Sequence, residues 1–206
     1  AAATEAGIND SLPIRPKLPA ERAAELERLF WPAKITDSEL PTWVIPIQPT
    51  WASRLFNSPE SLEPRADKLG ISREHVYYNS GRPPLTAPAR IIWYRSGRQL
   101  GGGQLFACSR LEQVLHGKPE ELHNRLSYLG VLGIDDVRGA ASPRGDVQAL
   151  RFADTELFPR PISLGTYRTI SGHQTDNVRN ARRITGPVFE ALYRRTYEAP
   201  QVRQVH

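Results

Sequence analysis

Proline and glycine divide this chain into short segments. They account for 18 and 15 of its 206 residues, and proline in particular ends a helix or excludes a central strand. Helical patterns are predicted over residues 19–31, 51–56, 110–116, 119–129 and 185–193. Strand-like patterns are predicted over residues 43–47, 75–78, 89–95, 104–109, 147–158 and 161–170. Short strands interspersed with short helices favour a small α+β domain built on a curved sheet or barrel.

The length and the two ends of the chain indicate one folded domain with tails. Residues 1–18 are small, polar and interrupted by proline, which is typical of a flexible tail or linker. We expect the domain over residues 19–197, with 19–40 as a helical N-terminal extension, and a second tail over 198–206. Because the chain begins with alanine and contains no methionine, we interpret it as one module of a larger protein.

The composition excludes several classes of protein. The single cysteine, Cys108, cannot form an internal disulfide or a thiolate zinc site. The five histidines show no metal-ligand spacing, and no phosphate-binding Gly-x-x-x-x-Gly-Lys loop is present. No stretch approaches the 18 apolar residues of a membrane span. We therefore expect no metal, no cofactor and no membrane association, and a cytoplasmic protein.

Positive charge is concentrated in two parts of the sequence. The C-terminal part, residues 160–206, contains eight arginines and three acidic residues, which accounts for the net charge of +5. Between Glu74 and Glu112 there are five arginines, four tyrosines or tryptophans and no acidic residue. Guanidinium groups for phosphates and rings for base stacking are what single-stranded nucleic acid requires. The alternative interpretation, a solvated basic face over core aromatics, fits the pattern equally well.

The clearest strand, residues 89–95, shows how few of these aromatics can line one site. Alternation places Trp93 and Arg95 on one face of the strand. It places Tyr94 and Arg90 on the other face. At most one of the two rings is therefore expected at a site. The same constraint applies to the pair Tyr77 and Tyr78.

A polar cluster, Asp154-Thr155-Glu156, interrupts an otherwise strand-like run. It could provide a general acid or base together with a hydroxyl group. We favour the interpretation that it marks a β-bulge or turn whose side chains bond the local backbone.

Residues 29–35 and 40–56 resemble the opening of an ASCH-type domain of the PUA-like superfamily. That family has a Gly-x-Lys-x-x-Glu-x-Arg motif, and residues 58–65 keep its Glu63 and Arg65 but have Ser58 and Glu60 instead of the glycine and lysine. Further segments resemble a PUA-like module appended to large bacterial acetyltransferase-type proteins, namely residues 76–78, 90–94, 107–111 and 154–158. The resemblance covers roughly residues 29–197.

The resemblance implies a small PUA-like β-pseudobarrel with flanking short helices, which binds RNA or a modified base in a cleft beside its first helix. Some ASCH-type relatives are nucleoside amidohydrolases or ribonucleases that use a lysine with a threonine and a glutamate. Glu60 stands where the resemblance would place that lysine. The resemblance therefore favours binding over catalysis.

Three functions follow as hypotheses. The first is a module that binds nucleic acid, as single-stranded RNA or a modified base, within a larger bacterial protein. Its candidate binding residues are Trp51, Arg54, Tyr78, Arg90, Trp93, Tyr94, Arg95, Arg110, Arg182 and Arg183. The second is a nucleoside- or RNA-acting hydrolase, with Thr155, Glu156 and Glu63 as acid/base candidates. The third is a non-catalytic protein-interaction domain of an effector or defence protein, in which Arg182 and Arg183 bind an acidic partner.

Overall fold

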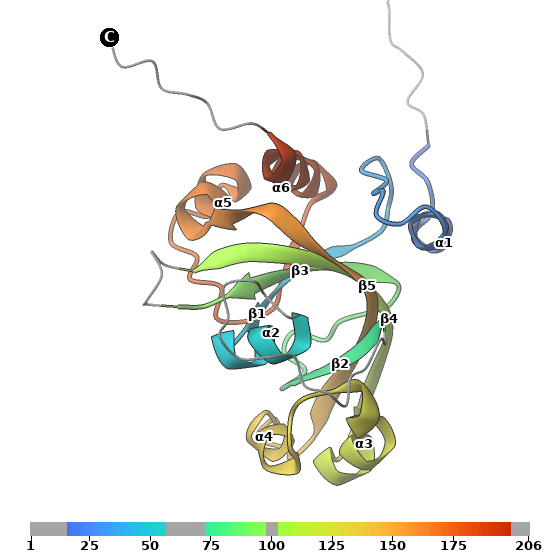
Figure 1. The fold of residues 1–206 in the computed structure, drawn as a ribbon, viewed down its shortest axis with the longest axis vertical. Coiled ribbons are helices and arrows are strands. Elements are labelled where there is room, and N and C mark those ends of the chain that lie inside the picture. The colour runs from blue at the N-terminus through green and yellow to red at the C-terminus, as the bar shows by residue number, and fades with distance from the viewer. Residues whose placement is uncertain (1–15, 57–72, 98–102, 199–206) are drawn as a thin grey trace, which may run out of the picture.

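The computed structural model describes residues 16–56, 73–97 and 103–198 (Figure 1). Its helices are α1 (Ala20–Leu29), α2 (Pro49–Phe56), α3 (Pro119–Leu126), the 3-10 turn η2 (Ser127–Leu129), α4 (Ile134–Gly139), α5 (Leu164–Ser171) and α6 (Gly186–Tyr197). Its strands are β1 (Thr42–Ile47), β2 (Glu74–Asn79), β3 (Ala89–Arg95), β4 (Gln104–Gly117), β5 (Val147–Ser163) and β6 (Arg182–Ile184). The candidate Glu63, and its neighbours Glu60 and Arg65, lie outside the described residues.

The strands form one six-stranded sheet in the order β2-β5-β4-β3-β1-β6. Every neighbouring pair is antiparallel except β1 and β3, which run parallel. Three register shifts interrupt the pairing of the long strands β4 and β5, and such bulges bend a strand and increase its twist. The sheet is therefore strongly curved (Figure 1). In the described residues β2 and β6 do not pair with each other, so the curved sheet stays open. The predicted α+β class with short flanking helices is confirmed.

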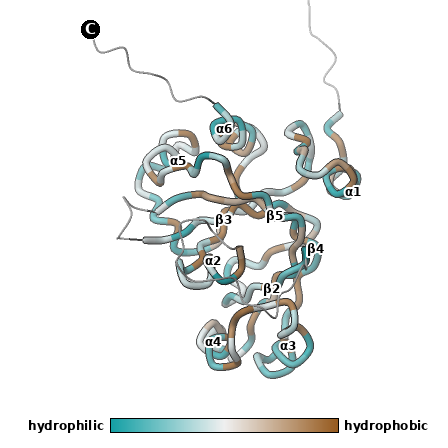
Figure 2. Tube along the Cα trace, viewed as in Figure 1, coloured by the Kyte–Doolittle hydropathy of each residue, from teal (hydrophilic) through white to brown (hydrophobic). Residues whose placement is uncertain are grey.

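The sheet separates two hydrophobic cores. The inner core, centred on Trp93, contains Phe56 and Phe152 and lies on the face covered by α2. The outer core contains Tyr167 and Phe189 and lies beneath α5 and α6. Hydrophobic segments run along the strands between these helices (Figure 2). The predicted alternation of β3 is confirmed, because Ile91 and Trp93 enter the inner core while Ile92 and Tyr94 enter the outer one.

Two predicted elements are wrong. The helix predicted over residues 110–116 is the second half of β4, which pairs with β5 as far as Gly117. The strand predicted over residues 161–170 ends at Ser163, and α5 follows it. The Ser163 hydroxyl accepts a hydrogen bond from the Thr166 N–H at 3.1 Å, which caps this helix. Gly172, with φ of 74°, ends it in the left-handed conformation that glycine favours. Pairing with β5 therefore makes residues 110–116 a strand, and the Ser163 cap starts a helix where a strand was predicted.

Position 103 requires glycine because its backbone lies directly against the Tyr94 ring, not because it forms a turn. A Cβ atom on this residue would overlap the Tyr94 phenol, which is buried in the outer core. Its carbonyl also accepts a hydrogen bond from the Leu164 N–H at 2.9 Å. We expect Gly103→Ala to lower the free energy of unfolding by about 1–3 kcal/mol through overpacking. Urea denaturation measures this, with Gly139→Ala as the control, because a Cβ there meets no atom within 4 Å. Equal effects of the two substitutions would contradict the assignment.

Candidate nucleic-acid interface

A cleft lies where the curved sheet stays open. The short strand β6 pairs only with Thr42–Val44 of β1, so no strand of the described chain borders the outer edge of β1 at residues 45–47. The cleft, about 480 Å³ in volume, is lined there by β1, by Tyr77 and Asn79 of β2, and by residues 177–181 before β6. Pro46 lies at this exposed edge and has no N–H to leave unpaired. The cleft is thus formed by both ends of the sheet.

The polar lining of the cleft is basic and rich in amides. The described lining contains no carboxylate. Its two charged groups are the exposed side chains of Arg82 and Arg179. Its four side-chain amides belong to Gln48, Asn79, Asn177 and Asn180. Guanidinium groups bind phosphate in a fixed fork geometry, whereas amides both donate and accept hydrogen bonds, as base edges require.

Tyr77 forms an aromatic part of the cleft wall. Its ring packs edge-on against Trp93, with 5.5 Å between the centroids. Its hydroxyl donates a hydrogen bond to the Pro46 carbonyl at 3.4 Å, which joins β2 to β1 across the cleft. Burial raises the pKa of Tyr77 to about 12. The hydroxyl therefore stays neutral at physiological pH and contributes no negative charge to a site for a polyanion.

A tight turn places Arg82 at the mouth of the cleft. The Asn79 side-chain oxygen accepts a hydrogen bond from the Gly81 N–H at 2.8 Å, a local bond that favours a turn. Gly81 has φ of 69°, a conformation that glycine adopts without strain. Arg82 follows directly and is exposed.

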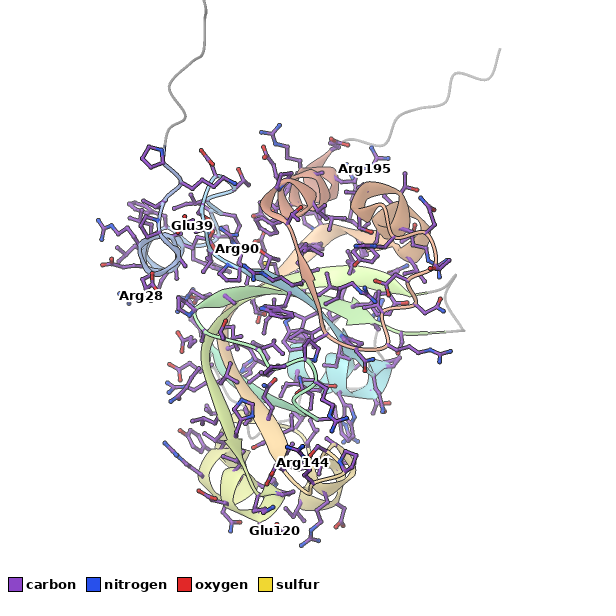
Figure 3. The ribbon with its side chains drawn as sticks, turned by 180° about the vertical axis from the view of Figure 1, so that it is seen from behind. Arg28, Glu39, Arg90, Glu120, Arg144 and Arg195 are labelled. Atoms are coloured by element: carbon purple, nitrogen blue, oxygen red, sulfur yellow. The ribbon has the colours of Figure 1, made fainter. Side chains whose placement is uncertain are left out.

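Arg90, predicted to contact phosphate, is instead part of the core. It is 1% exposed, and its guanidinium binds both carboxylate oxygens of Glu27 on α1. It also donates to the carbonyls of Ile35 and Leu40 and lies 4.4 Å from the centroid of the Phe189 ring. Figure 3 shows Arg90 between α1 and the sheet. Its guanidinium is buried and paired with Glu27, so we leave Arg90 out of the interface proposed below.

The other predicted arginines differ in their surroundings. Arg110 pairs with Asp154 at 2.8 Å and with Glu112 at 2.7 Å. The Arg95 guanidinium lies 5.4 Å from the ring centroid of Phe106. On β6, Arg183 is exposed, and the half-exposed Arg182 pairs with Asp176 at 2.6 Å. The β6 arginines lie next to the cleft because residues 177–181 lead directly into β6.

Three of the predicted stacking rings lie inside the protein. Tyr78, Trp93 and Tyr94 are 2%, 0% and 4% exposed, which leaves no face for a base. Trp51 on α2 is half-buried, and the Arg54 guanidinium lies 5.4 Å from its ring centroid. The structure therefore keeps Trp51 and Arg54 at the surface, on the helix that follows Gln48 of the cleft.

The two described catalytic candidates face opposite sides of the sheet. The Thr155 hydroxyl lies 2.7 Å from that of Ser109, which accepts a bond from the Trp93 indole in the inner core. Glu156 is buried beneath α6, where it pairs with Lys34 at 3.2 Å. Asp154, with φ of 52°, and a register shift opposite it form the bulge favoured from the sequence. Residues 154–156 therefore do not combine into one acid/base site.

Glu156 is held by a polar network below α6. It accepts hydrogen bonds from the hydroxyls of Tyr193, at 3.1 Å, and Tyr197. Burial, and then the hydrogen bond with Tyr197, raise the pKa of Tyr193. With Lys34, these contacts join β5, α6 and the segment after α1. A carboxylate with three partners is well suited to hold these elements together.

The main cleft residues were not identified as site residues from the sequence. Arg82 belongs to the acid-free window and Arg179 to the arginine-rich end, but nothing local distinguished them from their neighbours. The signals that could have found them were the Gly/Pro-rich turn over residues 81–88 and the polar, turn-forming composition of residues 173–180. In the described chain no helix could span a membrane and no group of three metal-ligating residues occurs.

Comparison with known proteins supports the fold assignment. No model of a protein family matches the sequence, and no curated protein does. The ASCH protein of Zymomonas mobilis aligns with a TM-score of 0.56 and 19% identity, over 73% of this chain and 92% of that one. A point mutant of the same protein aligns with a TM-score of 0.57 and 19% identity, over 73% and 93%. Human THYN1, in complex with DNA containing 5-methylcytosine, aligns with a TM-score of 0.47 and 6% identity. That alignment covers 78% of this chain and 99% of THYN1.

These likenesses concern the fold, because all identities are below one fifth. The chain has the ASCH-type, PUA-like fold that its sequence resembles. The alignment with THYN1 is too weak to support an argument about ligands. The function must therefore be argued from the residues of this chain.

Proposed function

We propose that this protein binds nucleic acid, with a nucleotide of single-stranded RNA or a modified base held in the cleft between β1, β2 and residues 177–181. The observation that supports this most is the lining of the cleft: two exposed arginines and four amides with no carboxylate among the described residues. The arginines would contact phosphates and the amides the base edge. Trp51, Arg54 and Arg183 would extend the contact surface beyond the cleft.

The proposal predicts salt-dependent binding that depends on Arg82 and Arg179. We expect labelled single-stranded RNA to bind more tightly than duplex DNA in fluorescence anisotropy at two salt concentrations. Replacing Arg82 or Arg179 by glutamine is expected to weaken binding about tenfold. Each loss is expected to reduce the slope of log K against log salt concentration by about 0.7, the value for one phosphate contact on a single strand.

The matched control is Arg28→Gln, at the exposed end of α1 (Figure 3). It removes the same charge without touching the cleft, and we expect its affinity to stay within about twofold of the parent because only long-range screened charge is lost. Binding that is indifferent to salt, or an equal loss in all three variants, would contradict the proposal. The same measurement with single-stranded DNA shows whether the protein prefers RNA or DNA. An RNA that carries one methylated base shows whether a modified base strengthens binding.

A further inference from the structure

A second cavity adjoins the cleft and shares one wall with it. It is about 560 Å³ in volume and is formed by residues 172–182, which connect α5 to β6. Asn177, Arg179 and Asn180 line both cavities. His173 and Gln174 line only the second one. A ligand that fills the first cavity and continues past the shared wall therefore enters the second.

The shared wall is fixed by a strained residue. Val178 has φ of 44°, which is rare for a β-branched side chain. Its side chain is 2% exposed in the outer core, and its N–H donates to the Asp176 carboxylate at 2.9 Å. Burying Val178 leaves the flanking Asn177 and Arg179 exposed, on the wall between the cavities. Strained backbone of this kind persists where the surroundings over-determine it, often at binding sites.

The described lining of the second cavity contains one carboxylate, and cationic groups compensate it. Asp176 is buried, and its side chain pairs with the Arg182 guanidinium at 2.6 Å. Arg168 donates to the Asp176 carbonyl at 2.8 Å and to the Asn177 side-chain oxygen at 2.6 Å. With the exposed Arg179 added, the groups around this cavity carry a net positive charge. A phosphate that enters it therefore meets no uncompensated negative charge.

We infer that the second cavity is a subsite for the next nucleotide, so that the protein selects a single-stranded chain of at least two nucleotides over a free nucleotide. This inference rests on the proposed function of the cleft. The first nucleotide occupies the cleft beside Arg82, and the second occupies the cavity beside His173 and Gln174. Arg179, on the shared wall, contacts the phosphate that joins them.

The test compares a 5′-nucleoside monophosphate with a tetranucleotide of the same base, as ribose and deoxyribose forms, by titration calorimetry. We expect the tetranucleotide to bind the parent protein at least about tenfold more tightly. Gln174→Glu places a negative charge in the second cavity at constant shape. It is expected to weaken tetranucleotide binding about tenfold through like-charge repulsion and to leave monophosphate binding within about twofold.

Gln113→Glu, on β4 and outside both cavities, is the matched control and should change neither affinity. Arg82→Gln should weaken both ligands, because it acts on the first nucleotide. Equal affinity of the parent for the two ligands, or unchanged tetranucleotide binding by Gln174→Glu, would overturn the second subsite while leaving the cleft proposal intact. Binding of neither ligand would overturn the proposed function and this inference together.

Discussion

Replacing Glu27 by leucine is expected to lower the free energy of unfolding by about 3–5 kcal/mol, the usual effect of leaving a buried charge without its partner. The side chains of Glu27 and Arg90 are 4% and 2% exposed. The shortest contact joins Arg90 Nη2 to Glu27 Oε1 at 2.6 Å. After the substitution the guanidinium keeps only neutral acceptors such as the Ile35 carbonyl. Urea denaturation followed by circular dichroism measures the loss.

Glu25→Leu is the matched control for this prediction. Glu25 lies on the same helix and pairs with Arg22 at 2.5 Å, but both side chains are about half exposed. Exposed pairs contribute at most about 1 kcal/mol. In the double variant Glu27→Leu/Arg90→Met both charges of this pair are removed, and part of the stability should return. If Glu27→Leu costs no more than Glu25→Leu, the buried pair does not hold α1 to the sheet.

Arg90 also shows why the charge pattern overestimated the interface. The window between Glu74 and Glu112 contains no acidic residue, so each of its arginines looked free in the sequence. The partner of Arg90 is 63 positions earlier in the chain, and Asp154, one of the two partners of Arg110, is 44 positions later. A window along the sequence counts neighbours in the chain, whereas an ion pair depends on neighbours in space. Only the strand pattern separates Arg90 from Arg82: Arg90 lies within the predicted strand 89–95, whereas Arg82 lies among the glycine and prolines that precede it.

Local patterns succeeded where a segment is determined by its own residues. The alternation of residues 89–95 predicted correctly which side chains share a face of the strand. The second half of β4 was beyond this reasoning, because its strand conformation comes from pairing such as Val114 with Leu150. The cleft was beyond it for the same reason. Its wall combines residues 45–48, 77–82 and 177–181, which only the curvature of the sheet brings together.

The two ends of β1 and β3 have different roles in this fold. At their first paired residues, Thr42 and Arg90, the strands are anchored to α1 through Glu27. At their last residues, Ile47 and Arg95, β6 no longer covers the edge of β1, and the cleft begins. A rigid strand pair fixed at one end can present an open edge at the other without losing its register.

Alkaline pH is expected to unfold this protein cooperatively between about pH 10 and 12. Burial raises the pKa values of Tyr77, Tyr78 and Tyr167 from 10.0 to about 12 each. Below pH 10 these phenols are neutral in both states, and their contribution to stability is fully present. Above pH 10 they ionise only in the unfolded chain, so the free energy of unfolding falls until the folded protein ionises as well.

The expected loss is about 2–3 kcal/mol for each of the three phenols, or about 7 kcal/mol at pH 12, which is comparable to the whole stability of a domain. Burial also raises the pKa of the Cys108 thiol to about 12, which acts in the same direction from pH 9 upwards. Urea midpoints measured from pH 8 to 12 test this, with tyrosinate absorbance recorded alongside. Tyr78→Phe should make the fall less steep, whereas Tyr128→Phe, at a 67% exposed site, should not. If every tyrosine of the folded protein ionises with a pKa near 10, these phenols are not buried as the structure places them.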